Sequence, residues 1–265
     1  MNSVSVVIST WNRAGMIEKA INSALSQTHP PMEVLVCDDG STDDTEEVVR
    51  SMNDSRVVWL PGIRSGLPAV PRNRGLRNSK GEWIAFLDDD DEWLPDKIEK
   101  QLICIEKSEC LASCSNALRL APNGDSGIYL YYDKSKICFY DLLQTNLIIC
   151  SSCIFHRSLI KVIEGFPESE NMKALEDYAL WLRISTYTDF AFLNEALIVY
   201  KDNPTESIRC KSEDVTYQYD KIISNYLWWF RHKQTSTKER YSTFFKYFAS
   251  LVLYARNKFR MLLLV

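Results

Sequence analysis

Five consecutive acidic residues, Asp88–Asp91 and Glu92, directly follow an apolar run at Trp83–Leu87. Two carboxylates about 5 Å apart repel each other by roughly 3 kcal/mol at an effective dielectric of about 20. Solvent, basic neighbours or a metal ion must offset that repulsion. Carboxylate oxygens suit Mg²⁺ or Mn²⁺, which also bind substrate phosphates. The acid run is therefore a candidate site for a divalent cation, with a solvated acidic loop as the plainer alternative.

Apolar runs and helical patterns alternate along the first hundred residues, and this alternation predicts where the acids lie. The expected strands are 4–9, 33–37, 57–60 and 83–87, and the expected helices are 14–27, a segment capped by Thr42 or Asp43, 67–79 and 95–108. Strands that alternate with helices predict a parallel, doubly wound sheet. Ligands bind such sheets at the carboxyl ends of the strands. The turn at Asp39 and the run Asp88–Asp91 should therefore face one crevice.

The second half of the chain predicts shorter elements. We expect two strands within 110–132 around the turn Pro122–Asp125, a strand at 151–155, a helix at 174–187, and short strands at 190–193 and 197–200. The composition is that of a globular protein, with 46% hydrophobic and 25% charged residues in a chain of 265. A chain of this length can bury a sizeable core.

Eight cysteines are scattered along the chain and do not suggest a disulfide framework. The pair Cys150 and Cys153 has the spacing of half a zinc site, but no second pair matches it, which favours buried free thiols. The first apolar run lacks the basic residues that precede the core of a secretory signal. Reduced thiols and the absence of that signal predict a cytoplasmic protein.

The charge of the chain is divided unevenly. Residues 221–265 hold nine basic residues against one acidic residue, a net charge of +8, whereas residues 1–220 hold 22 against 34, a net charge of −12. Within residues 221–265, apolar residues recur at helical spacing, namely Phe245, Phe248, Val252, Ala255, Phe259 and Leu262. The longest uncharged run there, 247–255, is far shorter than the ~20 residues of a membrane span. The pattern favours a helix in the membrane interface, attracted to anionic lipids. The alternative is a helical hairpin packed on the body.

Three classes of phosphate-binding protein are excluded by missing motifs. A haloacid-type phosphatase needs Thr or Val where Glu92 stands. A dinucleotide-binding oxidoreductase needs GxGxxG after its first strand, but the segment 9–13 contains no glycine, and a P-loop is also absent. The class that remains is an enzyme that holds a nucleoside diphosphate through a metal ion.

Four segments resemble, in order and spacing, the landmarks of family 2 glycosyltransferases. They are VSVVISTWNR, EVLVCDDGSTDDT, GEWIAFLDDDDEW and ALEDYALWLR, and the likeness runs from about residue 3 to residue 200. The resemblance implies the α/β fold called GT-A, with a Rossmann-like, mixed but mainly parallel sheet flanked by helices. It implies a nucleotide-sugar-binding half at 1–110 and an acceptor-binding half at 111–215. Residues 216–265 would form a helical C-terminal extension.

The resemblance also implies roles for individual residues. Ser9, Thr10, Trp11, Asp39, Arg72 and Asp89 would bind the nucleotide sugar, Asp88 and Asp90 would hold Mn²⁺ or Mg²⁺, Asp177 would be the general base, and Glu176 would position it. Inverting transfer needs one carboxylate to take the proton from the acceptor hydroxyl. The plainer interpretation of Glu176 and Asp177 is the acidic first turn of a helix.

We therefore expect a metal-dependent inverting glycosyltransferase that uses a nucleoside diphosphate sugar, with UDP as the expected nucleotide. The basic tail suggests a polyprenyl-diphosphate-linked glycan acceptor, a peripheral position on the inner face of the cell membrane, and a role in the synthesis of a surface polysaccharide or glycoprotein glycan. The QxxRW motif and membrane spans of processive members are absent, which predicts addition of one or a few sugars. Lys201, Ser207 and Arg209 are further candidates for phosphate contact, and no nucleic acid is expected. A non-catalytic nucleotide-sugar or glycan-binding module on the same fold is the alternative.

Overall fold

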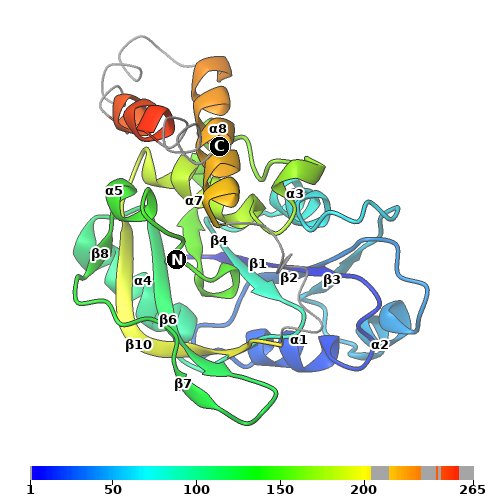
Figure 1. Ribbon diagram of the computed structural model, residues 1–265. Coiled ribbons are helices and arrows are strands. Elements are labelled where there is room, and N and C mark those ends of the chain that lie inside the picture. The colour runs from blue at the N-terminus through cyan, green and yellow to red at the C-terminus, as the bar shows by residue number, and fades with distance from the viewer. Residues whose placement is uncertain (1, 204–214, 234–242, 244–245, 257–265) are drawn as a thin grey trace.

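The computed structural model describes residues 2–203, 215–233, 243 and 246–256. At the centre of these residues lies one sheet with the strand order β3-β2-β1-β4-β9-β6-β10-β5 (Figure 1). The bounds are β1 Val4–Thr10, β2 Glu33–Asp38, β3 Val57–Leu60, β4 Trp83–Asp88, β5 Glu92–Trp93, β6 Ala112–Leu120, β9 Ile154–His156 and β10 Phe190–Lys201. Two short strands, β7 Ser126–Ile128 and β8 Lys136–Ile137, pair with β6 and β10.

The sheet is mixed but mainly parallel, as expected. Strands β1 to β4 are parallel to one another, and β6 and β10 are parallel to each other. Strand β9 lies antiparallel between β4 and β6, and β5 lies antiparallel to β10. The carboxyl ends of β1, β2, β4, β6 and β10 therefore point to the same edge of the sheet.

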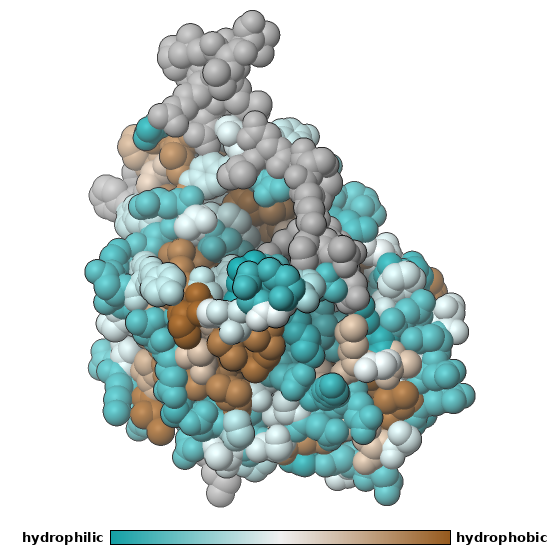
Figure 2. Space-filling view, turned by 60° about the horizontal axis from the view of Figure 1, so that its bottom comes forward, coloured by the Kyte–Doolittle hydropathy of each residue, from teal (hydrophilic) through white to brown (hydrophobic). Residues whose placement is uncertain are grey.

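Helices cover both faces of the sheet, and each face has its own apolar core. The core on one face includes residues of α1 Ile17–Leu25, α2 Thr45–Ser51 and α4 Lys97–Ser108, and the core on the other includes residues of α3 Ala69–Asn78, α5 Phe139–Leu142, α6 Ile160–Ile163, α7 Glu176–Ser185 and α8 Val215–His232. Side chains alternate along β1, so that Val7 enters one core while Val6 and Ile8 enter the other. Hydrophilic residues predominate on the face in Figure 2, where apolar residues gather in small groups.

The prediction of two separate short strands near residues 190–200 is wrong. The segments 190–193 and 197–200 belong to one strand, β10, which pairs with β6 along its length. The register shifts on both sides of Ala196, next to the exposed polar residues Asn194 and Glu195. An irregularity of this kind bends a strand without ending its pairing. The polar residues that resembled a turn therefore mark a bulge.

The first part of the basic tail contacts the body. Ile222, Tyr226 and Trp229 of α8 are buried in the same core as α7. In the helical segment 246–256, the Lys246 amine donates to the carbonyl oxygen of Ser185 at 2.6 Å. These contacts agree with a packed helical hairpin.

Part of the expected membrane stripe remains at the surface. Phe248 and Val252 are exposed, as is Trp228 of α8, whereas the stripe residues Phe245, Phe259 and Leu262 lie outside the described residues. Among the residues that the structure describes, we find no helix with the length and apolar character to cross a membrane.

Candidate functional site

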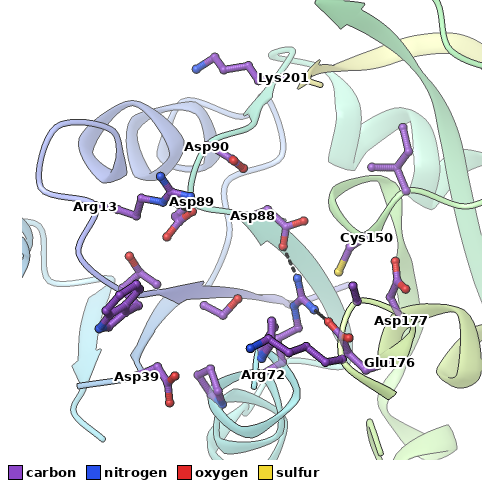
Figure 3. A pocket seen from close by; sticks show the side chains of 18 of the residues that line it. Arg13, Asp39, Arg72, Asp88, Asp89, Asp90, Cys150, Glu176, Asp177 and Lys201 are labelled. Carbon is purple, nitrogen blue, oxygen red and sulfur yellow. Dashed lines mark hydrogen bonds and ion pairs between the residues drawn. The ribbon is translucent and has the colours of Figure 1, made fainter. Parts of the chain in front are cut away.

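The register of the sheet sets the floor of a pocket at its carboxyl edge. Ser9 lies beside Asp88 across β1 and β4, and Thr10 lies beside Asp38 across β1 and β2. The cavity there has a volume of about 340 Å³, within the range of small-ligand sites. It is lined by the ten residues to which the family resemblance assigned roles, namely Ser9, Thr10, Trp11, Asp39, Arg72, Asp88, Asp89, Asp90, Glu176 and Asp177 (Figure 3).

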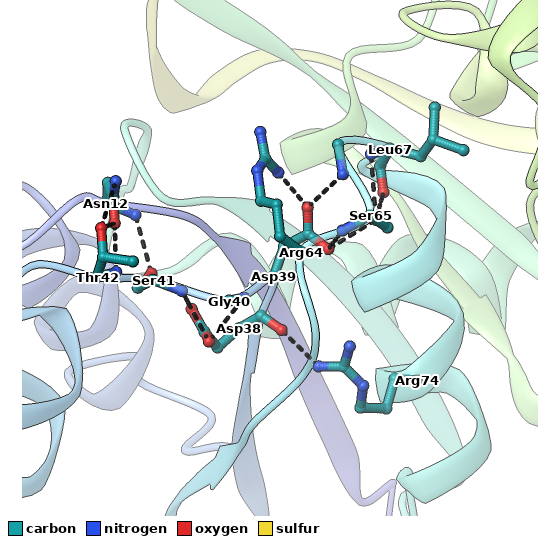
Figure 4. A network of polar contacts seen from close by, with 11 residues as sticks. Asn12, Asp38, Asp39, Gly40, Ser41, Thr42, Arg64, Ser65, Leu67 and Arg74 are labelled. Atoms are coloured by element: carbon teal, nitrogen blue, oxygen red, sulfur yellow. Dashed lines mark hydrogen bonds and ion pairs between the residues drawn. The ribbon is translucent and has the colours of Figure 1, made fainter.

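Asp39 lies at one end of the pocket, in the turn after β2. Its carboxylate accepts hydrogen bonds from Ser65 and from the backbone N–H of Gly66, and it forms an ion pair with Arg64 (Figure 4). The guanidinium carbon of Arg64 also lies 3.7 Å from the centre of the Trp11 ring. A stacking surface and a carboxylate are thus adjacent at this end.

The acid run divides between the pocket and the protein interior. Asp88, Asp89 and Asp90 line the pocket, whereas Asp91 is buried. The Asp91 carboxylate accepts hydrogen bonds from the Ser151 hydroxyl at 2.6 Å and from a backbone N–H at 3.1 Å. The same Ser151 oxygen accepts the Asp88 N–H at 3.0 Å. Asp91 thereby anchors the backbone that presents the other three acids.

The acids that line the pocket carry negative charge that the protein does not fully compensate. Burial raises the pKa of Asp89 to about 7, with a further contribution from Asp90, while Arg13 at 3.6 Å opposes the shift. Burial also raises the pKa of Asp90, and the charge of Asp88 adds to it. Uptake of a proton or approach of a positive group would relieve the repulsion among these acids.

Arg72 joins the two acidic motifs. It lies on α3, is buried, and donates to Asp88 at 2.6 Å and to Glu176 at 2.8 Å (Figure 3). A buried guanidinium between two carboxylates satisfies both charges in a fixed fork geometry. Acids separated by almost ninety residues in the sequence are therefore held on facing walls of one pocket.

Asp177 lies in the first turn of α7, directly after Glu176. Burial raises the pKa of Asp177 to about 7, and the negative charge of Glu176 adds to the shift, whereas Arg72 opposes it. The residue before the helix cap, Ala174, has a left-handed φ of 63°. Such strain in a non-glycine residue is most common at functional sites. Asp177 has the features of a group that exchanges a proton near neutral pH.

Sequence reasoning missed two arginines in the pocket. Arg13 lies in the loop after β1, and Arg64 lies in the loop after β3. Their position near the ends of parallel strands was a signal for the edge of the sheet on which they lie, but not for the acid that each contacts. Lys201, a candidate from the sequence, also lines the pocket, and its amine pairs with Glu92 at 2.8 Å. The other two phosphate candidates, Ser207 and Arg209, lie outside the described residues.

The cysteines of the described residues are free thiols, including the pair Cys150 and Cys153. Burial raises the pKa of both thiols well above the ordinary value, so that they are protonated and inert. Within the ranges that the structure covers, no group of three or more His, Cys, Asp or Glu side chains is arranged to hold a metal ion.

Comparison with known proteins identifies relatives of the chain. Residues 5–163 match the family model described as glycosyl transferase family 2. The chain is 35% identical over 184 residues to WfaP of Escherichia coli, a UDP-Glc:α-D-GlcNAc-diphosphoundecaprenol β-1,3-glucosyltransferase, covering 69% of this chain and 70% of the relative. It is 29% identical over 219 residues to TuaG of Bacillus subtilis, a putative teichuronic acid biosynthesis glycosyltransferase, covering 81% of this chain and 85% of the relative.

A solved structure shares the fold. TarS of S. aureus in complex with UDP-GlcNAc superposes with a TM-score of 0.69 at 19% sequence identity, over 94% of this chain and 72% of that chain. The likeness supports the GT-A architecture expected from the sequence. Because the family match spans more than half of the chain, the chain belongs to glycosyl transferase family 2 and is a glycosyltransferase.

Proposed function

We propose that this glycosyltransferase moves a sugar from a UDP-sugar to a hydroxyl group of a polyprenyl-diphosphate-linked glycan, with inversion at the anomeric carbon. Two relatives named for transfer from UDP-Glc to GlcNAc-diphosphoundecaprenol support this donor and acceptor class. The observation that carries the proposal is the Arg72 bridge, which holds the acid run and the Glu176–Asp177 pair around one cavity.

The nucleotide would occupy the end of the pocket that Trp11 and Asp39 form. The Trp11 ring would stack on the base, and Asp39 would accept its N–H. Ser9 and Thr10 at the end of β1 would line the nucleoside, while Asp89 and Arg72 would contact the ribose and phosphates. In this proposal, residues 1–110 bind the donor and residues 111–215 bind the acceptor.

Asp88 and Asp90 are the residues that would hold a divalent cation, Mn²⁺ or Mg²⁺. The fit rests on their hard oxygen donors and on the raised pKa of Asp90, which is caused by burial and then by the charge of Asp88. When bound, the ion would neutralise negative charge that develops on the departing diphosphate.

Asp177 would act as the general base. In a single displacement, the acceptor oxygen forms a bond to the anomeric carbon as the bond from that carbon to the diphosphate breaks. The acceptor hydroxyl proton passes to the Asp177 carboxylate. Burial and then the neighbouring carboxylate of Glu176 raise the pKa of Asp177, which improves it as a proton acceptor.

The acceptor class is consistent with the chemistry of the tail. A polyprenyl carrier lies in a membrane, and residues 221–265 carry a net charge of +8. Exposed Trp228, Phe248 and Val252 supply apolar groups beside this charge. We infer that residues 216–265 associate with the anionic inner face of the cell membrane.

Incubation with Mn²⁺, a panel of nucleotide sugars and a synthetic polyprenyl-diphosphate-GlcNAc acceptor tests the proposal by mass spectrometry. We expect a mass increase of one hexose or N-acetylhexosamine with a UDP-sugar. A non-catalytic binding module would bind nucleotide sugar but release no UDP and extend no acceptor. Extension only with another nucleotide would refute the proposed donor.

A further inference from the structure

Arg64 lies in the place proposed for the nucleotide base. Its guanidinium carbon is 3.7 Å from the centre of the Trp11 ring, and the same guanidinium forms an ion pair with Asp39. The guanidinium therefore contacts both the stacking surface and the carboxylate proposed to bind the base, and Figure 4 shows its contact with Asp39. A planar cation thus occupies a site that is shaped for a planar base.

The Asp39 carboxylate has no position left for a base. One oxygen accepts from the Ser65 backbone N–H at 2.9 Å and from the Ser65 hydroxyl at 2.6 Å. The other accepts from the Gly66 N–H at 3.0 Å and from Arg64. An ionised carboxylate offers about four acceptor positions, and all are used. A base N–H can reach Asp39 only if one of these donors leaves.

Arg64 is the donor that can leave most readily. Its side chain is 42% exposed, whereas that of Asp39 is 5% exposed. Two of the other donors are backbone N–H groups, fixed by the loop itself. That loop is held against the Asp39 turn because Gly40 has a φ of +77° and a Cβ at Gly40 would lie 2.6 Å from the Arg64 backbone nitrogen. The backbone is therefore fixed while the arginine side chain can rotate into solvent.

We propose that Arg64 is a gating residue that competes with the nucleotide base for Trp11 and Asp39. This inference rests on the proposed function, which places the base between those two side chains. When a nucleotide binds, the base takes over the stacking contact, and its N–H replaces the guanidinium at Asp39. Uracil presents such an N–H at N3, whereas cytosine presents an acceptor there. The apparent affinity for the nucleotide is the intrinsic affinity reduced by the fraction of molecules in which Arg64 has left.

The Arg64→Ala variant tests this competition by calorimetric titration with UDP in the presence of Mn²⁺. Removal of the competitor should tighten UDP binding by about twofold to tenfold, as for a gate that is open in roughly half to a tenth of the molecules. The affinity for inorganic pyrophosphate should not change, because pyrophosphate does not reach the base site. Ile63→Ala is the matched control, since the neighbouring Ile63 is 91% exposed and its removal should change neither affinity.

Unchanged or weaker UDP binding by Arg64→Ala would overturn the gate, and so would an equal gain in affinity for pyrophosphate. Arg64→Gln, which keeps a polar side chain, should give a gain of the same sign. The proposed base site has its own test in Trp11→Ala and Asp39→Asn. Wild-type UDP affinity in both of these variants would show that the base binds elsewhere. Loss of affinity in both, with no gain in Arg64→Ala, would reject the gate alone.

Discussion

The two ends of the pocket treat their carboxylates differently. At the proposed nucleotide end, Asp39 accepts four hydrogen bonds, one of them from Arg64. At the opposite end, Asp177 accepts the backbone N–H of Tyr178 at 2.6 Å and lies beside a second acid, Glu176. Full hydrogen bonding fixes the orientation of the Asp39 carboxylate, whereas burial beside a like charge favours proton uptake by Asp177. One end is suited to binding and the other to chemistry.

The largest effect should come from the chemical end. Asp177→Asn removes the proposed proton acceptor without changing the size of the side chain, so transfer should fall by about 10²- to 10⁴-fold. Binding of UDP, measured by calorimetry, should stay within about twofold of wild type. Glu170→Gln, an exposed acid shortly before the same helix, is the control and should keep wild-type turnover. Turnover that survives in Asp177→Asn would remove the distinction between the two ends.

Loss of the Arg72 bridge between Asp88 and Glu176 should strongly lower the free energy of unfolding. Arg72→Met leaves Asp88 and Glu176 without their shared partner, and loss of one member of a buried ion pair costs about 3–5 kcal/mol. Urea denaturation measures this loss. Arg77→Met on the same helix is the matched control, because its side chain is 64% exposed and should contribute less than about 1 kcal/mol. Equal stabilities would show that the bridge does not hold the two walls together.

A substitution at the proposed nucleotide end should change the affinity for UDP more than the rate of turnover. Asp39→Asn removes a charged acceptor and should weaken UDP binding by about tenfold to a hundredfold, since a hydrogen bond to a charged group contributes about 1.5–3 kcal/mol. Turnover at saturating donor should change by less than about threefold. Asp44→Asn, an exposed acid a few residues along the chain, should leave the affinity unchanged. A large fall in turnover at saturation, with unchanged affinity, would place Asp39 in the chemical step.

The smallest effect concerns pH. Because Asp177 must be ionised to accept a proton and burial raises its pKa to about 7, turnover should rise with pH through about 7 and then level off. Glu176→Gln removes the negative charge that helps to raise this pKa, so the midpoint should move to lower pH by on the order of half to one unit. A midpoint that moves to higher pH would mean that Glu176 acts mainly through Arg72.

The sequence predicted the strand ends well because the acids stand where apolar runs stop. The run that ends at Asp88 and the turn at Asp39 both reach the pocket that parallel topology implies. The partners of these acids were not predictable. Arg64 reaches Asp39 from 25 residues away, and Arg72 reaches Glu176 from 104 residues away. A single sequence contains no local signal for contacts of that separation.

Short or irregular elements were also missed, for local reasons. Helices α5 and α6 contain four residues each, too few to show a helical period. The bulge in β10 interrupts the apolar alternation at Asn194 and Glu195, which resembles a turn in sequence. Tertiary pairing with β6 continues through it.

The anomeric configuration of the product is the most direct test of a single displacement with Asp177 as the base. Wild-type protein is incubated with an α-linked UDP-sugar and a lipid-linked acceptor, and the new linkage is assigned by the one-bond and vicinal proton couplings of its anomeric signal. The account predicts a β linkage. An α linkage would require retention and would contradict direct attack by an acceptor hydroxyl deprotonated at Asp177.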